Sequence, residues 1–393
     1  MDFTFTEEQQ AAVEAARAVF SDVAPDGAPS PALTPGAVAE DIDRQLWHEL
    51  ARTDLLGLTL SPDHGGAGLD PIALCLVLRE SAKVLARVPL LESCAVAMAI
   101  ERYGDRTLAA ELLPRAGRGG LILTVGANGR SGHDPAELAV SARPYGSGDG
   151  AGEGETDGSA GGSGWVLDGV QSAVPWAQAA DWIAVPAHTA GGRPVLALVP
   201  RTRDGVTLAD QVSTNGERLA EVRLDAVRVE ARELIDADGC WDWLRSLLTT
   251  GTCALALGLG ERVLAMTAEY TGKREQFGFP VATFQAVAVQ AADRYIDLRA
   301  MEATLWQAAW RISTDTGGPL PAAGDVAVAK IWASDGVRRV VQTAQHLHGG
   351  FGADTDYPLH RYHAWAKQIE LSLGPAAAHE EALGDLLAAH PLG

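Results

Sequence analysis

The sequence predicts a multidomain α+β protein in which an N-terminal helical domain, a central β domain and a C-terminal helical bundle follow one another. Apolar residues recur at helical spacing in residues 5–112 and again beyond Cys240. Between these regions, residues 119–236 contain short Val- and Leu-rich runs bounded by Gly, Pro or Asp, which are typical of strands. The 393 residues suffice to bury more than one core.

The N-terminal helical domain is expected to span residues 1–118. Thr6 is a suitable N-cap residue and precedes a run that is apolar at helical spacing. A Pro- and Gly-rich stretch, SPDHGGAGLD, interrupts the helical pattern. The predicted helices are TEEQQAAVEAARAVF, DRQLWHELARTDLLGL, PIALCLVLRESAKVLARV and LLESCAVAMAIERYG. The third is apolar on most faces, which predicts that it is buried.

The central domain, residues 119–238, is expected to form a small β-barrel or sandwich. Its predicted strands are LILTV, WVLDGVQSAV, DWIAVPA, PVLALVP and LAEVRLDAVRV. The glycine-rich stretch 146–164 has no apolar anchor, so we expect a flexible loop between two strands.

The C-terminal domain, residues 239–393, is expected to be a four-helix bundle. The helical pattern returns after the β region and continues to the end of the chain. The predicted bundle helices are WDWLRSLLTTGTCALALGLGERVLAMTAEYTGKREQF, FQAVAVQAADRYIDLRAMEATLWQAAWRIS, GDVAVAKIWASDGVRRVVQTAQHL and AHEEALGDLLAAH.

Charge and composition exclude several classes of function. A formal net charge of −20 disfavours nucleic acid, which requires a basic surface. We expect neither a signal peptide nor a membrane span, and therefore a cytoplasmic protein. The cysteines lack C-x-x-C spacing, which argues against a metal site or a disulfide framework: Cys75, Cys94, Cys240 and Cys253. An anionic ligand would need local basic residues, because the overall charge opposes it.

Three motifs carry a resemblance to a known family. The stretch YTGKREQFGFPVATFQ resembles the Y-x-x-x-R-x-Q-F-G-x-P-I-x-x-F-Q signature of the acyl-CoA dehydrogenases. HLHGGFGADTDYPLHRY is similar to the family's second C-terminal signature, and LTLSPDHGGAGLD to its N-terminal glycine-rich loop. The resemblance implies FAD-dependent α,β-dehydrogenation of an acyl-CoA thioester, with an electron-transfer flavoprotein as electron acceptor.

The two C-terminal motifs contain the expected cofactor-binding residues. Arg274 is a permanently charged fork that suits a pyrophosphate, and Gln276 and Phe277 add a hydrogen-bonding group and an apolar surface. Gly349 and Gly350 allow a backbone to approach a phosphate. His346 stands where the family usually has Gln and retains a hydrogen-bonding nitrogen. The resemblance implies that these residues bind an FAD held by a neighbouring subunit.

The catalytic base of the family is not found at its usual places. The dehydrogenation needs a carboxylate that removes the α-proton of the thioester. Ungapped counting places the usual Glu at Leu373, and the alternative Glu of other members at Leu248. Neither leucine can accept a proton. Glu370 is the best nearby alternative, although it is more easily explained as an ordinary surface or ion-paired carboxylate.

The segments that would hold the chain's own flavin also depart from the family. Thr124 is retained and is expected to contact FAD, but the Glu-Pro pair that should follow it is Val125 and Gly126. The W-I-T strand reads Ala-Val-Pro at residues 173–175, which removes a large stacking surface and a hydroxyl.

This split resembles that of the non-catalytic subunit of heteromeric acyl-CoA dehydrogenases of the steroid side-chain type, and the resemblance implies such a role for this chain. A paralogous subunit would supply the base and most of the flavin cradle, and FAD would be shared across their interface. One alternative is a self-sufficient flavoenzyme with a relocated base such as Glu370. Another is a flavin-free binding or structural member of the fold. The residues do not decide which acyl group is bound.

Overall fold

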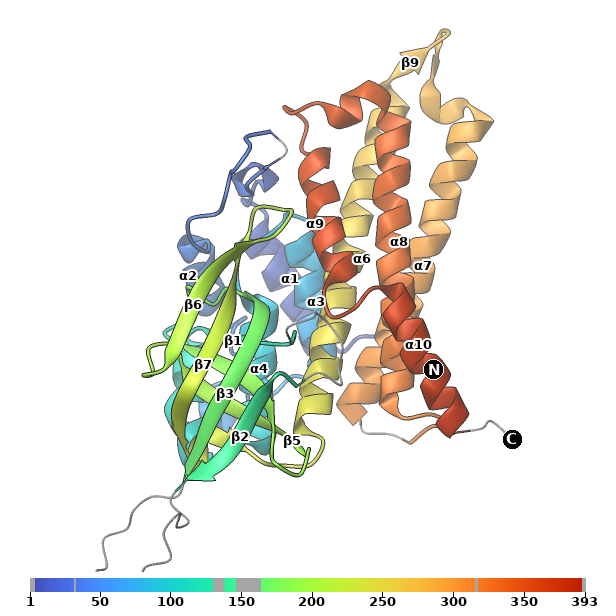
Figure 1. Ribbon diagram of the computed structural model, residues 1–393. Coiled ribbons are helices and arrows are strands. Elements are labelled where there is room, and N and C mark those ends of the chain that lie inside the picture. Colours follow the sequence, from blue (N-terminus) through green and yellow to red (C-terminus); the bar gives the residue numbers. More distant parts are fainter. Residues whose placement is uncertain (1–3, 32, 130–137, 146–163, 315–316, 391–393) are drawn as a thin grey trace, which may run out of the picture.

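The computed structural model describes residues 4–31, 33–129, 138–145, 164–314 and 317–390. Figure 1 shows a sheet beside a long helical bundle, with the N-terminal helices packed between them. The predicted fold class and the order of its three regions are confirmed. The predicted domain boundaries fall in the connections between α5 and β1 and between β8 and α6, and they stay predictions. Apart from Gly164, the glycine-rich stretch 146–164 lies outside the described residues.

The N-terminal region contains five helices in its described part: α1 Glu7–Phe20, α2 Arg44–Arg52, α3 Pro71–Ala82, α4 Leu90–Tyr103 and α5 Arg106–Gly117. Thr6 caps α1 as predicted, with its hydroxyl accepting a hydrogen bond from the Gln9 backbone N–H at 3.2 Å. Gln9 completes the capping box by accepting from the Thr6 N–H. Most of α3 is buried, which agrees with its uniform hydrophobicity.

The central region is one eight-stranded sheet within the described residues. Its strand order is β6-β7-β3-β2-β4-β5-β8, and β1 pairs in parallel with β4. The strands are β1 Leu123–Val125, β2 Val140–Tyr145, β3 Gly164–Pro175, β4 Trp182–His188, β5 Pro194–Pro200, β6 Val206–Val212, β7 Arg218–Glu230 and β8 Leu234–Ile235. Sequence patterns missed β2, β6 and β8, because β2 is largely polar, β6 exposes much of its length and β8 has only two residues.

Strands β4 and β5 are buried on both faces. Ile183 and Val185 of β4 pack into a core that the sheet itself encloses with β3 and β7. The alternate residue Ala184 and Leu196 of β5 belong to the larger core shared with the helices. Because side chains alternate between the faces of a strand, one strand pair contributes to both cores. This packing fixes the sheet against the helical regions.

The C-terminal region consists of α6 Cys240–Lys273, α7 Gln285–Thr314, α8 Ala322–His348, α9 Leu359–Leu371 and α10 Ala376–Ala389. Figure 1 shows α6 to α9 lying side by side, with α10 crossing the lower part of the bundle. A hairpin of β9 Glu275–Gln276 and β10 Phe279–Pro280 projects from the far end. The predicted first bundle helix therefore ends earlier than expected, since Arg274 to Pro280 form the hairpin and not helix.

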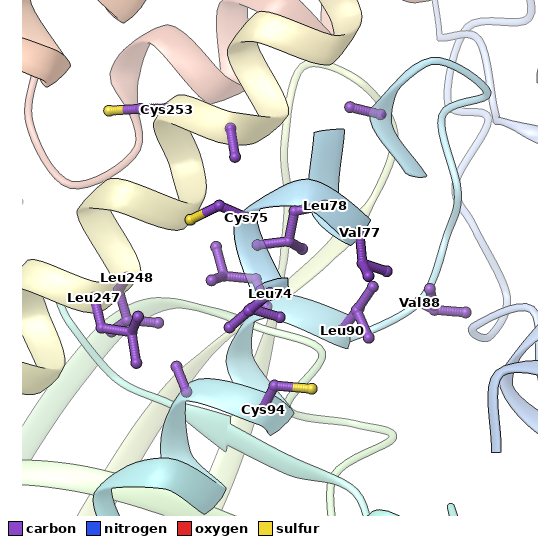
Figure 2. Close-up of a cluster of buried hydrophobic side chains, with 14 of the residues drawn as sticks. Leu74, Cys75, Val77, Leu78, Val88, Leu90, Cys94, Leu247, Leu248 and Cys253 are labelled. Carbon is purple, nitrogen blue, oxygen red and sulfur yellow. The ribbon is translucent and has the colours of Figure 1, made fainter. Parts of the chain in front are cut away.

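Helix α6 is the core helix of the protein. Among the described helices it alone is long and apolar enough to cross a membrane, but 78% of its most apolar window is buried inside the protein. Figure 2 shows Leu247 and Leu248 of α6 in a hydrophobic cluster with Leu74 and Cys75 of α3. The length and hydrophobicity of α6 are thus accounted for by its contacts with neighbouring helices.

Candidate cofactor-binding site

A cavity of about 890 Å³ lies at the hairpin end of the bundle. It is formed by the last turn of α6, the hairpin, the first turns of α7, the last turn of α8 and the short 3₁₀ helix that follows α8. The residues that line it are Tyr270, Arg274, Gln276, Val281, Ala286, Val287, Gln290, His346, Leu347, His348, Gly349, Gly350, Phe351 and Asp354. Both C-terminal sequence motifs therefore meet at one cavity.

Most of the predicted cofactor residues lie together in this cavity. Arg274, Gln276 and His346 line it, as do Gly349 and Gly350. These residues come from two segments separated by about 70 positions, which the antiparallel course of the bundle helices brings together. Phe277 does not line the cavity, and Thr124 lies elsewhere in the molecule.

Arg274 is the residue that best suits an anionic ligand. It is exposed and has no ion-pair partner within the described residues, in a protein of net charge −20. Its backbone ends α6, where its N–H donates to the Tyr270 carbonyl at 2.8 Å. The Arg274 carbonyl in turn accepts from the Val281 N–H at 2.8 Å, which closes the base of the hairpin. The guanidinium thus extends from a fixed backbone, without a counter-ion in the described part of the chain.

The hairpin turn places Phe277 at its tip. Phe277 and Gly278 both have left-handed backbone, with φ of +55° and +82°. Two such residues match the twist of a tight two-residue hairpin, which glycine tolerates and phenylalanine adopts only with strain. The Phe277 ring is 90% exposed and forms a T-shaped pair with the Phe284 ring, with the centroids 6.3 Å apart. An exposed aromatic ring on a strained backbone indicates a surface that contacts another molecule.

The two cavity glycines have different structural roles. Gly349 ends α8 with φ +57° and ψ −137°, a conformation open essentially to glycine alone. Gly350 has ordinary backbone, and a Cβ atom there would meet nothing within 4 Å. Glycine at position 350 therefore keeps space open in the cavity, while glycine at position 349 is required by the turn.

Helix dipoles at the cavity partly oppose one another. The N-terminus of α7 lies at the cavity wall and favours an anion. The C-terminal ends of α6 and α8 also lie there, and Asp354 contributes a carboxylate to the lining. An anionic group would therefore be bound chiefly by Arg274 and the start of α7, and not by the field of the whole cavity.

An aromatic cluster supports the cavity wall. The Tyr270 ring stacks on His348, with centroids 4.4 Å apart, and on Phe351 at 5.2 Å. His348 Nδ1 lies 2.8 Å from the Ala344 carbonyl and donates to it, so Nε2 accepts from the Tyr357 hydroxyl at 3.2 Å. Burial lowers the pKa of His348, which keeps its ring neutral. From the sequence, His346 was named as a cofactor-binding residue and His348 was not. Tyr270, on which His348 stacks, belongs to the first motif and was the available signal.

Leu373 lies in the turn that follows α9, two residues beyond the end of the helix at Leu371. Its backbone is left-handed, with φ +58°, and Gly374 follows with φ +100°. The Leu373 carbonyl accepts a hydrogen bond from His379 Nε2 at 2.9 Å, which ties this turn to α10. The side chain packs against the helical core. The position at which counting places the usual Glu is thus an apolar residue in a fixed turn, and its assignment as the place of the base stays a prediction.

The side chains at the other two candidate positions, Leu248 and Glu370, are buried in the core and ion-paired, respectively. Leu248 is 3% exposed and lies in the hydrophobic cluster of Figure 2. The Glu370 carboxylate accepts from Lys367 Nζ at 2.6 Å and lies 3.9 Å from Arg338 Nε. Its side chain is only 12% exposed, and Glu370 does not line the cavity. Within this geometry Glu370 acts as an ion-pair partner.

Thr124 is completely buried in β1. Its hydroxyl donates to the Pro175 carbonyl at 2.6 Å, so its hydrogen is already used within the protein. A side chain at Gly126 would meet Gln171 Cγ at 2.8 Å, which shows that the chain's own side chains fill this place. Thr124 does not join the other predicted residues at the cavity, and its contact with FAD stays a prediction.

Comparison with known proteins agrees with these features. Family models described as the acyl-CoA dehydrogenase N-terminal and C-terminal domains match residues 6–120 and 248–387. Acyl-CoA dehydrogenase FadE27 of Mycobacterium tuberculosis is 36% identical over 89% of both chains. A chain in the crystal structure of the ChsE4-ChsE5 complex of M. tuberculosis superposes with a TM-score of 0.86 at 34% identity, covering 100% of both chains.

A second solved structure, a variant of the Tcur3481-Tcur3483 steroid ACAD, gives a TM-score of 0.84 at 35% identity and covers 98% of both chains. The similarity therefore extends over the helical regions and the sheet together. With matching family models at both ends and a relative more than 30% identical over most of its length, the chain belongs to the acyl-CoA dehydrogenase family, whose members are oxidoreductases.

Proposed function

We propose that this chain is one subunit of a heteromeric, FAD-dependent acyl-CoA dehydrogenase. In this proposal the chain holds part of an FAD whose flavin cradle and catalytic base belong to a paralogous partner subunit. One observation carries the proposal. The cavity gathers the groups that suit a dinucleotide, while the positions expected for a base are Leu373 and Leu248.

The residues at the cavity fit the pyrophosphate part of FAD. Arg274, which forms no ion pair with the residues that the structure describes, offers a planar guanidinium for bidentate hydrogen bonds to phosphate oxygens. Gln276 adds an amide, and the open space at Gly350 admits a phosphate close to the backbone. Phe351 is 40% exposed and presents a ring on which a planar base could stack. When bound, FAD supplies the acceptor for the hydride removed from the acyl-CoA.

The state of Glu370 favours a partner-supplied base over a relocated one. A general base must present a free carboxylate to the proton that it removes. Glu370 is instead held by Lys367 and lies near Arg338, on helix α9 and outside the lining of the cavity. The version in which this chain works alone with Glu370 as base therefore has the weaker support.

The relatives suggest the partner and the substrate class. A similar chain was solved as part of a complex of two named proteins, and another is described as a steroid ACAD. We therefore propose a steroid-derived acyl-CoA thioester as substrate and a paralogous chain as partner. An electron-transfer flavoprotein is the expected electron acceptor, and the complex is expected to be cytoplasmic.

Co-expression with a paralogous chain encoded nearby tests this function. The chain alone should bind little FAD and have no dehydrogenase activity, while the co-purified complex should absorb as a flavoprotein and turn over acyl-CoA. Arg274→Ala should lower the FAD content of the complex at least about tenfold, since a charge-assisted phosphate contact is lost. An active flavoprotein purified from this chain alone would contradict the proposal. A complex that forms without flavin would favour a structural role.

A further inference from the structure

A smaller cavity, of about 270 Å³, lies where the N-terminal region meets the sheet. Three segments far apart in the sequence form its walls: the loop that leads into α2, the turn after β3 and the start of β7. The lining residues come from positions 39–44, 176–179 and 217–218. None of these residues lines the cofactor cavity, so the smaller cavity is a separate feature of the molecule.

The walls of this smaller cavity are joined by hydrogen bonds. The Ala39 N–H donates to the Gly216 carbonyl at 2.9 Å. The Arg87 guanidinium donates to the Asp41 carbonyl at 2.6 Å and to the Glu217 carboxylate at 2.5 Å. These bonds connect the loop before α2 with the start of β7. The cavity is therefore largely preformed, as small-molecule sites usually are.

Gln178 presents a buried acceptor that has no donor. Its Nε2 donates to Asp210 Oδ1 and to the Leu219 carbonyl, both at 2.9 Å, so both amide hydrogens are used. Its Oε1 atom is buried and has no hydrogen-bond partner in the described part of the chain. Because a buried carbonyl oxygen is normally paired, this wall of the cavity calls for an N–H or O–H donor from another molecule.

The carboxylates at the smaller cavity differ in whether they are paired. Asp41 accepts from Arg44 Nε at 2.8 Å, and Glu217 is held by Arg87. Glu40 is exposed and forms no ion pair with any residue that the structure describes. Glu40 is therefore the acidic group at this cavity that is free to bind a cation.

The groups that would favour an anion at this cavity are offset by acidic neighbours. Arg44 is held in its ion pair, and the Arg218 guanidinium lies 3.9 Å from Asp210. The N-terminus of α2 is capped by Asp43, whose carboxylate accepts from the Leu46 N–H at 2.9 Å. The net charge of −20 also attracts cations to the protein. The local and the overall charge thus agree.

Trp176 adds an aromatic surface to the lining. Its backbone is left-handed, with φ +58°, which is costly for a tryptophan. Its carbonyl accepts from the N–H groups of Ala179 and Ala180, at 2.9 and 3.0 Å, which fixes the turn. A strained residue that is held in place at a cavity indicates a functional constraint. The face of an indole ring attracts cations, so Trp176 complements Glu40.

We propose that the smaller cavity binds an organic cation with N–H donors, of the alkylammonium or alkylguanidinium class. One N–H group donates to Gln178 Oε1, while the positive charge lies against Glu40 and the Trp176 ring. The volume of about 270 Å³ is just below that of drug-sized ligand pockets and therefore suits a small amine. A free amine and a lysine or arginine side chain of a partner both present this chemistry. The inference does not rest on the proposed function.

Isothermal titration calorimetry of the purified full chain with agmatine tests the inference. Agmatine carries a guanidinium and an ammonium group and should bind at a single site. Tetramethylammonium has the charge but no N–H group, so it leaves Gln178 Oε1 unpaired and should bind at least about tenfold more weakly. Glu40→Gln should weaken agmatine binding about fivefold or more, because a charge-assisted contact is lost.

Glu14→Gln is the matched control for Glu40→Gln. Glu14 is also exposed and has no ion-pair partner among the described residues, but it lies on α1. Both substitutions change the net charge of the protein by the same amount. Glu14→Gln should leave agmatine binding unchanged, and thermal melting checks that both variants fold.

Several results would overturn the inference. It is wrong if agmatine does not bind the folded chain. It is also wrong if Glu14→Gln weakens binding as much as Glu40→Gln does, since the overall charge would then attract the cation. Tighter binding of inorganic phosphate than of agmatine would contradict it as well, because the arginines would then define the site.

A second titration, of the complex with the paralogous chain, identifies the source of the cation. Agmatine binding that persists in the complex supports a free amine as the ligand. Agmatine binding that is present in the isolated chain and lost in the complex supports a basic side chain of the partner in the cavity. If no such complex forms, the proposed function fails, while the titration of the chain alone still decides the inference.

Discussion

The ammonium nitrogen of Lys330 lies 2.9 Å from the carbonyl oxygen of Ile369, in the last turn of α9. The same nitrogen lies 3.1 Å from the Glu370 carbonyl, which also accepts from Ser334 Oγ. Lys330 is completely buried, so its charge faces the negative end of the α9 dipole without water. This contact fixes the turn that leads to Leu373. The turn is therefore held in place by a buried contact from α8.

Replacing Lys330 by Met should destabilise the chain by about 1–3 kcal/mol, because a buried carbonyl of α9 loses its donor. Burial lowers the pKa of Lys330 to about 8. Between about pH 8 and the ordinary lysine pKa, the unfolded chain binds more protons than the folded chain does. The free energy of unfolding should therefore rise with pH in this range. Lys330→Met should lack this rise. Chemical denaturation at pH 8 and pH 10 measures both effects, and equal pH slopes would contradict the assignment.

Glu370→Gln distinguishes an ion-pair partner from a catalytic base. Because Lys367 holds the carboxylate, the complex should keep its turnover within about twofold, and stability should change by no more than about 1 kcal/mol. Lys367→Met serves as control and should have a similarly small effect on stability. Steady-state kinetics of the flavin-loaded complex provide the measurement. Loss of turnover with FAD still bound would instead identify Glu370 as the base.

Phe277→Gly should preserve or raise the stability of the isolated chain but weaken binding in the complex. Glycine adopts the left-handed turn without strain, so the isolated chain should be as stable as before or more stable by about 1 kcal/mol. The complex should lose affinity for the partner's cofactor or for the partner, because the exposed ring is removed. Phe277→Asn, which also tolerates this backbone, should behave similarly. Undiminished FAD content in both variants would contradict a binding role for the ring.

Acid should loosen the aromatic cluster at the cavity. Burial lowers the pKa of His348, so the unfolded chain binds more protons below its ordinary pKa of about 6.5. The free energy of unfolding should therefore fall as the pH drops through that value. His348→Phe keeps a stacking ring that cannot be protonated and should weaken the pH dependence. Thermal melting at pH 7.5 and pH 5.5 tests this, and part of the dependence should persist because burial also lowers the pKa of His360 and His363.

The sequence predicts the order of the regions well, because each has a strong period of its own. Thr6 caps α1 as expected, and α3 is buried as its composition requires. Prediction fails where the pattern is weak. The exposed edge strand β6 has no continuous apolar face, and the two-residue strands of the hairpin after Lys273 are too short to give a period of their own.

The sequence motifs name most of the residues that the structure brings to the cavity, but they do not reveal which residues contact one another. The two motifs name Arg274 and Gly350, but only the course of the bundle shows that they share a cavity. The Glu370–Lys367 pair is local to α9, but the turn that leads to Leu373 also depends on hydrogen bonds from Lys330 and Ser334 of α8. Counting residues along a chain cannot reveal these contacts from α8, since they join elements far apart in sequence.

Gly350→Leu should remove the cofactor without harming the fold. Gly350 has ordinary backbone, and a Cβ atom added there would meet no other atom within 4 Å, so a leucine side chain would extend into the cavity and strain nothing. Stability of the isolated chain should change by no more than about 0.5 kcal/mol, as at other unhindered surface sites. Gly384→Leu on α10 is the matched control, since a Cβ atom there is equally unhindered but lies away from the cavity. Flavin absorbance of the purified complex should fall sharply for Gly350→Leu and stay unchanged for Gly384→Leu. If both complexes retain full flavin, the cavity is not where this chain meets the cofactor, and the role assigned to Arg274 fails with it.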